Sequence, residues 1–136
     1  MQGAGYSFHA PAGWTVARTG ATTTAANGQV DLLEVLHFTL EKPYQAARFA
    51  AVARELDRDA AGLAKQNSGR LVDRLTMQVT GRKTRFYEIA YAPGTTEEIA
   101  FVLDAKNEYQ LLCRRRSAAS DAACAQFFSS FALGPA

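Results

Sequence analysis

Two cysteines and two histidines are the side chains in this sequence best suited to covalent or redox chemistry. Cys113 lies near the end of a predicted strand, and Cys124 lies in the first turn of a predicted helix that follows closely. A disulfide between them would attach that helix to the strand and stabilise the fold by about 3 kcal/mol in the loop-entropy model. Because both lie near the ends of elements and the pair leaves no odd cysteine, we expect the disulfide. Two buried free thiols are the alternative.

The two histidines, His9 and His37, each fall on a predicted strand. The sequence leaves open a hydrolytic pairing of His37 with Cys113, but no nucleophile motif surrounds either cysteine and the pattern G-x-S-x-G is absent. We interpret both as ordinary strand histidines. No CxxC or HxxxH spacing predicts a metal site, and no glycine-rich loop opens a helix. We therefore assign no catalytic, cofactor-binding or metal-binding residue.

Glu97 and Glu98 are adjacent, and a pair of carboxylates could carry out acid–base chemistry. Successive residues of a strand point to opposite faces of the sheet, so these two do not act as a pair.

Basic residues gather at two places, one rich in aromatic neighbours and one a run of three arginines. Cations beside aromatic rings are typical of proteins that bind single-stranded nucleic acid. The net charge of +2 argues against nucleic acid, and we interpret the basic residues as edge-strand charges that deter strand pairing. They remain the candidate interaction surface, which comprises Arg82, Lys83, Arg85, Arg114 and Arg116.

The elements that would position these residues begin with a long helix predicted from Pro43 to Gln66. Its apolar residues recur at steps of three and four and therefore share one face; they are Phe49, Val52, Ala53, Leu56, Ala60, Leu63 and Ala64. Pro43 suits the first turn, and Gly69 supplies the stop. A second amphipathic helix is predicted over Asp121–Phe131.

Strand patterns, separated by turn residues, occupy most of the remaining chain. Short turns imply antiparallel neighbours. The alternation in residues 70–80 predicts Leu71, Leu75, Met77 and Val79 on one face of their strand. The strands predicted at residues 30–40 and 98–105 are apolar on both faces, which predicts a sheet that is covered on both sides. The predicted strands are Tyr6–Ala10, Trp14–Arg18, Ala21–Ala26, Val30–Leu40, Arg70–Thr80, Lys83–Ala92, Glu98–Ala105 and Tyr109–Arg115.

These elements predict an α+β fold, an α/β/α sandwich. An antiparallel sheet of about seven strands carries the long helix on one face and the C-terminal helix on the other. The length of 136 residues, with 48% hydrophobic and 21% charged residues, indicates one ordinary globular domain spanning residues 5–133. No signal peptide follows Met1, so we expect either a cytoplasmic protein or one whose targeting segment is missing. A disulfide would favour the second, extracytoplasmic location: periplasm, cell surface or secreted.

The opening residues from Tyr6 to Trp14 resemble the F-x-x-P-x-G-W motif of the PsbP-like proteins, a superfamily that includes bacterial DcrB-like envelope proteins. The order of the elements agrees, and the closing Ser130-Phe131 resembles the S-F ending of that family. The resemblance implies a non-enzymatic, often exported, accessory or protein-binding domain. Bacterial members are commonly periplasmic proteins or lipoproteins, which implies contact with a membrane only through an N-terminal anchor. No functional residue of a relative maps onto a motif here.

We therefore expect a non-catalytic extracytoplasmic domain that binds another protein, with no cofactor and no nucleic acid. The alternative is a small-molecule or lipid-binding domain, which predicts an apolar pocket between the sheet and the Pro43–Gln66 helix. A hydrolase that uses cysteine or histidine ranks third.

Overall fold

The computed structural model of the chain describes residues 2–3 and 5–134. These residues form ten strands, two α-helices and one short 3₁₀-helix. In chain order the elements are β1 (Gln2–Gly3), β2 (Tyr6–Ser7), β3 (Thr15–Thr19), β4 (Thr22–Asn27), β5 (Asp31–Thr39), η1 (Ala46–Arg48), α1 (Phe49–Gln66), β6 (Gly69–Val79), β7 (Arg82–Tyr91), β8 (Thr95–Asp104), β9 (Asn107–Arg116), α2 (Ala122–Ser130) and β10 (Ala132–Leu133).

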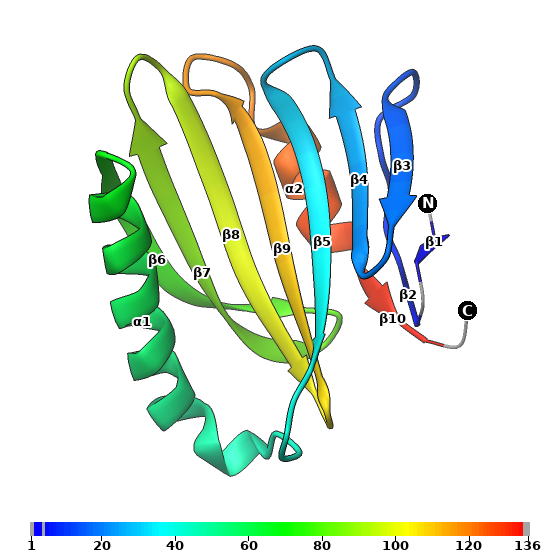
Figure 1. The fold of residues 1–136 in the computed structure, drawn as a ribbon, viewed down its shortest axis with the longest axis vertical. Helices are drawn as coiled ribbons and strands as arrows, with labels where there is room; N and C mark the ends of the chain where they lie inside the picture. The colour runs from blue at the N-terminus through cyan, green and yellow to red at the C-terminus, as the bar shows by residue number, and fades with distance from the viewer. Residues whose placement is uncertain (1, 4, 135–136) are drawn as a thin grey trace.

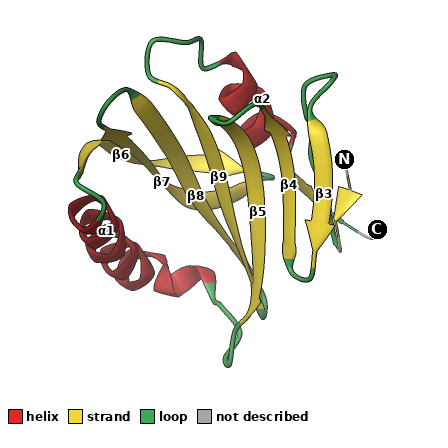
Figure 2. Ribbon diagram, turned by 45° about the horizontal axis from the view of Figure 1, so that its top comes forward, coloured by secondary structure: helices red, strands yellow, loops and turns green. Residues whose placement is uncertain are grey.

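Seven of the strands form one antiparallel sheet in the order β3-β4-β5-β9-β8-β7-β6 (Figure 1). The chain leaves the sheet after β5, passes through α1, and returns as the meander β6-β7-β8-β9, whose last strand pairs with β5. The turn between β4 and β5 places Gly28 at a φ of +69°, a conformation that glycine adopts without steric cost. The helices lie on opposite faces of this sheet (Figure 2), so the predicted α+β sandwich is confirmed.

The first predicted strand, Tyr6–Ala10, is wrong in length and in place. Only Tyr6–Ser7 is extended and paired, and β2 belongs to a separate three-stranded sheet with β1 and β10. The physical reason is that the aromatic side chains of this segment enter the core. The Tyr6 hydroxyl lies 2.6 Å from Thr23 Oγ1, and the Phe8 ring meets the Phe127 ring edge-on at 5.1 Å.

The larger core lies between α2 and the sheet. Phe127, Phe128 and Phe131 fall at helical spacing on and just after α2, and all three are buried. They pack against Tyr6, Phe8 and inward-facing residues of β5 and β9. Burial of each aromatic side chain contributes about 1.5–3 kcal/mol, so this cluster is the main source of stability on this face.

The core under α1 is much smaller. Ala60 and Ala64 are the buried residues of α1, and Ala64 packs with Ile89 and Ile99. The helix packs mainly against β6 and β7, at one edge of the sheet. The prediction that a helix covers both faces of the strand predicted as Val30–Leu40 is therefore wrong. On β5, the α1-facing side chain of Phe38 remains 45% exposed.

A β-bulge in β6 corrects the predicted alternation of that strand. The register shifts between Leu71 and Asp73, because Leu71 pairs with Ile89 whereas Asp73 pairs with the next residue along β7, Glu88. A bulge inserts one unpaired residue and moves the following side chains to the opposite face. Leu71 therefore lies in the core under α1, while Met77 and Val79 lie in the core under α2.

The long helix begins later than the prediction at Pro43. Backbone bonds hold the preceding segment against the β8–β9 turn: Leu40 N donates to Lys106 O, and Tyr44 N donates to Ala105 O, both at 2.7 Å. The chain therefore forms no helix before η1, and α1 proper runs from Phe49 to Gln66.

Candidate functional site

α1 is fixed to the sheet by a polar cluster near its middle. The Asp57 carboxylate accepts hydrogen bonds from Arg85 Nε at 2.9 Å, from Arg85 Nη2 at 3.1 Å and from the Tyr87 hydroxyl at 2.5 Å. Arg74 Nη1 lies 3.8 Å from the same carboxylate. The hydrogen bond from Arg85 is the largest cause of the lowered pKa of Asp57, and burial is the largest cause of the raised pKa of Tyr87.

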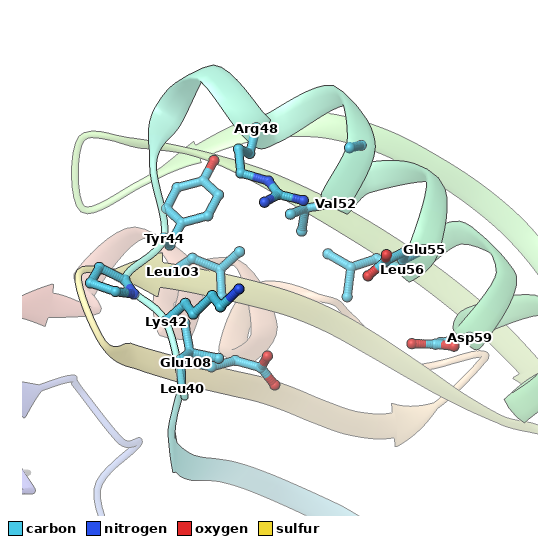
Figure 3. A pocket seen from close by; sticks show the side chains of 12 residues that line it. Leu40, Lys42, Tyr44, Arg48, Val52, Glu55, Leu56, Asp59, Leu103 and Glu108 are labelled. Carbon is cyan, nitrogen blue, oxygen red and sulfur yellow. The ribbon is translucent and has the colours of Figure 1, made fainter.

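The opposite side of α1 does not close onto the sheet. A cavity of about 270 Å³ lies between the first half of α1 and the strands β8 and β9 (Figure 3). Val52 and Leu56 form its helical wall, Leu103 and Glu108 form its floor, and the segment before η1 contributes Leu40 and Tyr44 at one end. We call this cavity the α1 cleft.

A second cavity, of about 450 Å³, lies farther along the same side of α1. Leu63 of the helix faces Ile99, Phe101 and Gln110 of the sheet across it, and Leu63 remains 38% exposed. Asp59 lines both cavities. The open side of the helix is therefore bordered by a groove along most of its length.

Four of the five charged residues that line the α1 cleft are divided between its two ends. Lys42 and Arg48 lie at the end where α1 begins, and Glu55 and Asp59 lie farther along the helix (Figure 3). Among the described residues, none of these four charges has an ion-pair partner within 4.0 Å. Apolar side chains lie between them, but Glu108 adds a carboxylate to the floor. The cleft thus has apolar side chains between a cationic end and an anionic end, with a carboxylate on its floor.

The tyrosine at the cationic end is in a partly dry environment. Burial raises the pKa of Tyr44. Its hydroxyl, protonated at neutral pH like that of any tyrosine, can donate a hydrogen bond.

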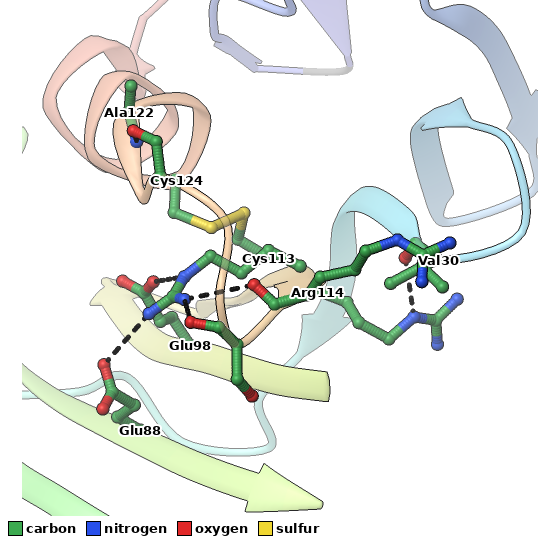
Figure 4. The surroundings of a disulfide bond; sticks show 11 residues. Val30, Glu88, Glu98, Cys113, Arg114, Ala122 and Cys124 are labelled. Atoms are coloured by element: carbon green, nitrogen blue, oxygen red, sulfur yellow. Dashed lines mark hydrogen bonds and ion pairs between the residues drawn. A yellow bond between two sulfur atoms is a disulfide. The ribbon is translucent and has the colours of Figure 1, made fainter. Parts of the chain in front are cut away.

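The predicted disulfide is present. Cys113 on β9 and Cys124 on α2 are joined with a Cα–Cα distance of 5.5 Å, and both residues are buried (Figure 4). The alternative of two free thiols is wrong, and so is a thiol pairing with His37. The His37 ring instead stacks on Tyr109, and its Nε2 lies 2.8 Å from Asn107 Oδ1.

The candidate interaction surface of five basic residues does not form one patch. Arg82 pairs with Asp104 at 2.8 Å, and Lys83 Nζ lies 5.0 Å from the centre of the Phe49 ring. Arg85 holds Asp57, as described above.

The other two residues of that set lie at the opposite end of the sheet. Arg114 Nε donates to Val30 O at 2.9 Å, Arg114 Nη1 lies 3.8 Å from Glu97, and Arg116 is exposed at the end of β9. The interpretation as edge-strand charges is also wrong, because β7 and β9 are interior strands.

The structure shows a partly buried ion-pair cluster that sequence reasoning missed. Arg115 Nε donates to Glu98 Oε2 at 3.0 Å, Arg115 Nη2 lies 3.6 Å from Glu88, and the disulfide lies beside this cluster (Figure 4). Burial is the largest cause of the raised pKa of Glu98. Glu97 points to the other face, where it meets Arg114, so the predicted separation of Glu97 from Glu98 is confirmed. The alternation of side chains along β8 and β9 was the only signal in the sequence for this pairing. It places Arg115 on the same face as Glu98, and Arg114 on the same face as Glu97.

Within residues 2–3 and 5–134, no group of three or more histidine, cysteine, aspartate or glutamate side chains has a metal-site arrangement. Neither helix of the described chain is long and apolar enough to cross a membrane.

Comparisons with known proteins support the fold alone. No protein-family model and no curated protein matches the chain. A crystal structure from Bacteroides thetaiotaomicron, at 1.50 Å resolution, is similar with a TM-score of 0.63 and 11% sequence identity. The match covers 95% of this chain and 45% of that protein, so the present chain corresponds to less than half of its length.

Proposed function

We propose that this chain is a non-catalytic, extracytoplasmic binding domain whose ligand occupies the α1 cleft. The observation that carries the proposal is the one-sided attachment of α1. The helix is tethered through Asp57 and packed through Ala60 and Ala64. This leaves a groove along its other side, which has apolar walls and charges without an ion-pair partner among the described residues. Small-molecule sites typically combine apolar walls with a few polar groups that fix orientation.

The charge arrangement favours a zwitterionic ligand with an apolar body. Arg48 and Glu55 are seven residues apart along the helix, which corresponds to about 10 Å at 1.5 Å per residue. An extended chain rises about 3.4 Å per residue, so a tripeptide spans this distance with its carboxylate at Arg48 and its ammonium group at Glu55. A fatty acid would use the cationic end alone.

The disulfide supports the extracytoplasmic location, because disulfides persist mainly in oxidising compartments. The non-catalytic assignment is supported by where the nucleophile and base candidates lie. His37 is stacked on Tyr109 and both cysteines are joined under α2, on the face of the sheet opposite the cleft.

The test is a titration of ¹⁵N-labelled protein with Ala-Leu-Ala and, separately, with decanoate, followed by amide chemical shifts. Ala51 lines the cleft, whereas its neighbour Ala50 is exposed and does not. We expect Ala-Leu-Ala to shift amides of α1 and β8, Ala51→Trp to abolish the shifts, and the matched control Ala50→Trp to preserve them. Binding that is unaffected by Ala51→Trp would refute the site. Tighter binding of decanoate would favour a lipid ligand.

A second candidate function is binding of another protein. It is favoured by a separate observation: β6 ends the sheet, and no strand of the described residues pairs with its outer edge.

A further inference from the structure

The outer edge of β6 offers backbone hydrogen-bonding groups to an incoming strand. β6 has eleven residues and pairs only with β7 among the described strands. Proteins commonly protect such edges with bulges, charges or proline. Here the bulge and the charged residues Arg70, Asp73 and Arg74 lie in the first half of the strand. The stretch from Leu75 to Val79 carries no charge and no proline, so its edge is open to pairing.

An apolar groove lies directly beside this stretch, between β6 and α2. Its volume is about 370 Å³, and we call it the β6–α2 groove. Leu75 and Met77 of β6 line one side, and Ala125 and Phe128 of α2 line the other. Phe86 of β7 lies on its floor, where its ring meets the Phe128 ring edge-on at 5.6 Å.

The groove is accessible to a partner. Leu75 is 37% exposed although it lies beside a cluster of apolar side chains. A strand added to β6 would place every second side chain on the α2 face, next to this groove.

The charges on the α1 face of β6 determine which side chains of the added strand would fit on that face. Arg74 points to the α1 face, pairs across to Tyr87, and keeps 58% of its side chain exposed even though it lies 3.8 Å from Asp57. Arg54 precedes Asp57 by three residues on α1 and therefore lies on the same side of the helix. The α1-facing side chains of an added strand would meet this positive charge, which favours glutamate or aspartate.

We propose that β6 and the β6–α2 groove bind an extended segment of a partner protein as an additional strand. Apolar side chains at alternate positions of that segment enter the groove, and acidic side chains between them face Arg74. Main-chain hydrogen bonds along an edge strand supply affinity in such complexes, and side-chain pockets supply specificity. This inference rests on the second candidate function above, and it assigns the site and the chemistry of the partner.

The test uses two blocked heptapeptides, one alternating glutamate with leucine and the other alternating lysine with leucine, titrated into ¹⁵N-labelled protein up to about millimolar concentration. We expect the glutamate peptide to shift amides of residues 73–79 and 125–129. A version N-methylated at alternate positions, which lacks the main-chain donors, should not bind. Arg74→Glu should reverse the preference between the two peptides.

Two matched variants locate the contact. Leu75→Arg replaces an apolar wall of the groove with a charged side chain and should weaken binding at least about tenfold, because the leucine side chains of the peptide would have to displace its hydration. Val72→Arg makes the same change on the same strand, at a residue that is also exposed but lies in the bulge outside the groove. It should leave the affinity unchanged.

The outcomes separate this inference from the binding function in the α1 cleft. Shifts confined to the α1 cleft, or no shifts with either peptide, would overturn the β6 site and leave the cleft proposal standing. Equal loss in Leu75→Arg and Val72→Arg would also overturn it. So would a dimer in sedimentation equilibrium that Leu75→Arg dissociates, because a second copy would then occupy the edge.

Discussion

Removal of the Cys113–Cys124 disulfide should destabilise the domain by about 3 kcal/mol. The bond closes a loop with a sequence separation of 11 residues. The loop-entropy relation, −2.1 − 1.5R ln n cal/mol/K, then gives roughly −9 cal/mol/K, or about 2.8 kcal/mol at 25 °C. At about 2.1 cal/mol/K of unfolding entropy per residue, 136 residues convert this to a decrease in Tm of roughly 10 °C.

The assay is urea unfolding of the wild type and the Cys113→Ala/Cys124→Ala double variant, followed by circular dichroism. The same measurement on the wild type in dithiothreitol provides a control that keeps both sulfur atoms. Both cysteines are buried, so reduction of the folded protein should require transient opening of α2 and proceed slowly. A loss below about 1 kcal/mol, or immediate reduction under native conditions, would refute the reasoning that the bond anchors α2.

The remaining predictions concern α1 and its connection to β6. Asp57→Asn should cost about 1.5–3 kcal/mol at pH 7 in urea unfolding, because Asp57 accepts charged hydrogen bonds from Arg85. Since the folded pKa of Asp57 is lowered, this contribution is present above its unfolded pKa of about 3.9 and disappears as the pH falls through the folded value. A cost that does not decrease between pH 7 and pH 2 would contradict this account. Gly69→Ala should destabilise the folded domain by about 1–3 kcal/mol, because the new Cβ would lie 2.5 Å from a ring carbon of Tyr91. In Gly62→Ala the new Cβ meets nothing within 4 Å, and the better helix propensity of alanine should stabilise the domain by up to about 1 kcal/mol.

Periodicity in the sequence predicted the elements well but could not predict how completely the helices cover the sheet. The apolar stripe of α1 includes both Ala64 and Leu63, yet the structure buries Ala64 and leaves Leu63 partly exposed. Spacing shows which residues share a helix face, but the lateral position of the helix depends on contacts between elements. The Asp57–Arg85 pair that sets this position joins residues 28 positions apart in the sequence. The residues around Asp57 do not predict Arg85 as its partner, and the residues around Arg85 do not predict Asp57.

The bulge in β6 illustrates a second limit. Strict alternation along the strand predicts that Leu71 and Leu75 lie on the same face. The one residue inserted by the bulge instead puts Leu71 on the α1 face. The disulfide was predictable because cysteines have few alternatives. The α1 cleft and the β6–α2 groove were not assigned residue by residue, since each combines side chains from three or more elements.

The α1 cleft follows from two attachments that hold the helix at different places. Near its start, the bond from Tyr44 N to Ala105 O draws the chain toward the β8–β9 turn. Toward its end, the small side chains of Ala60 and Ala64 allow the helix to approach β7 closely. The helix therefore runs along the β6–β7 edge of the meander and does not reach across β8 and β9, which leaves the floor of the cleft between two fixed walls. Because those walls are held by backbone bonds and buried contacts, a ligand would meet a preformed site and lose little affinity to the ordering of the protein.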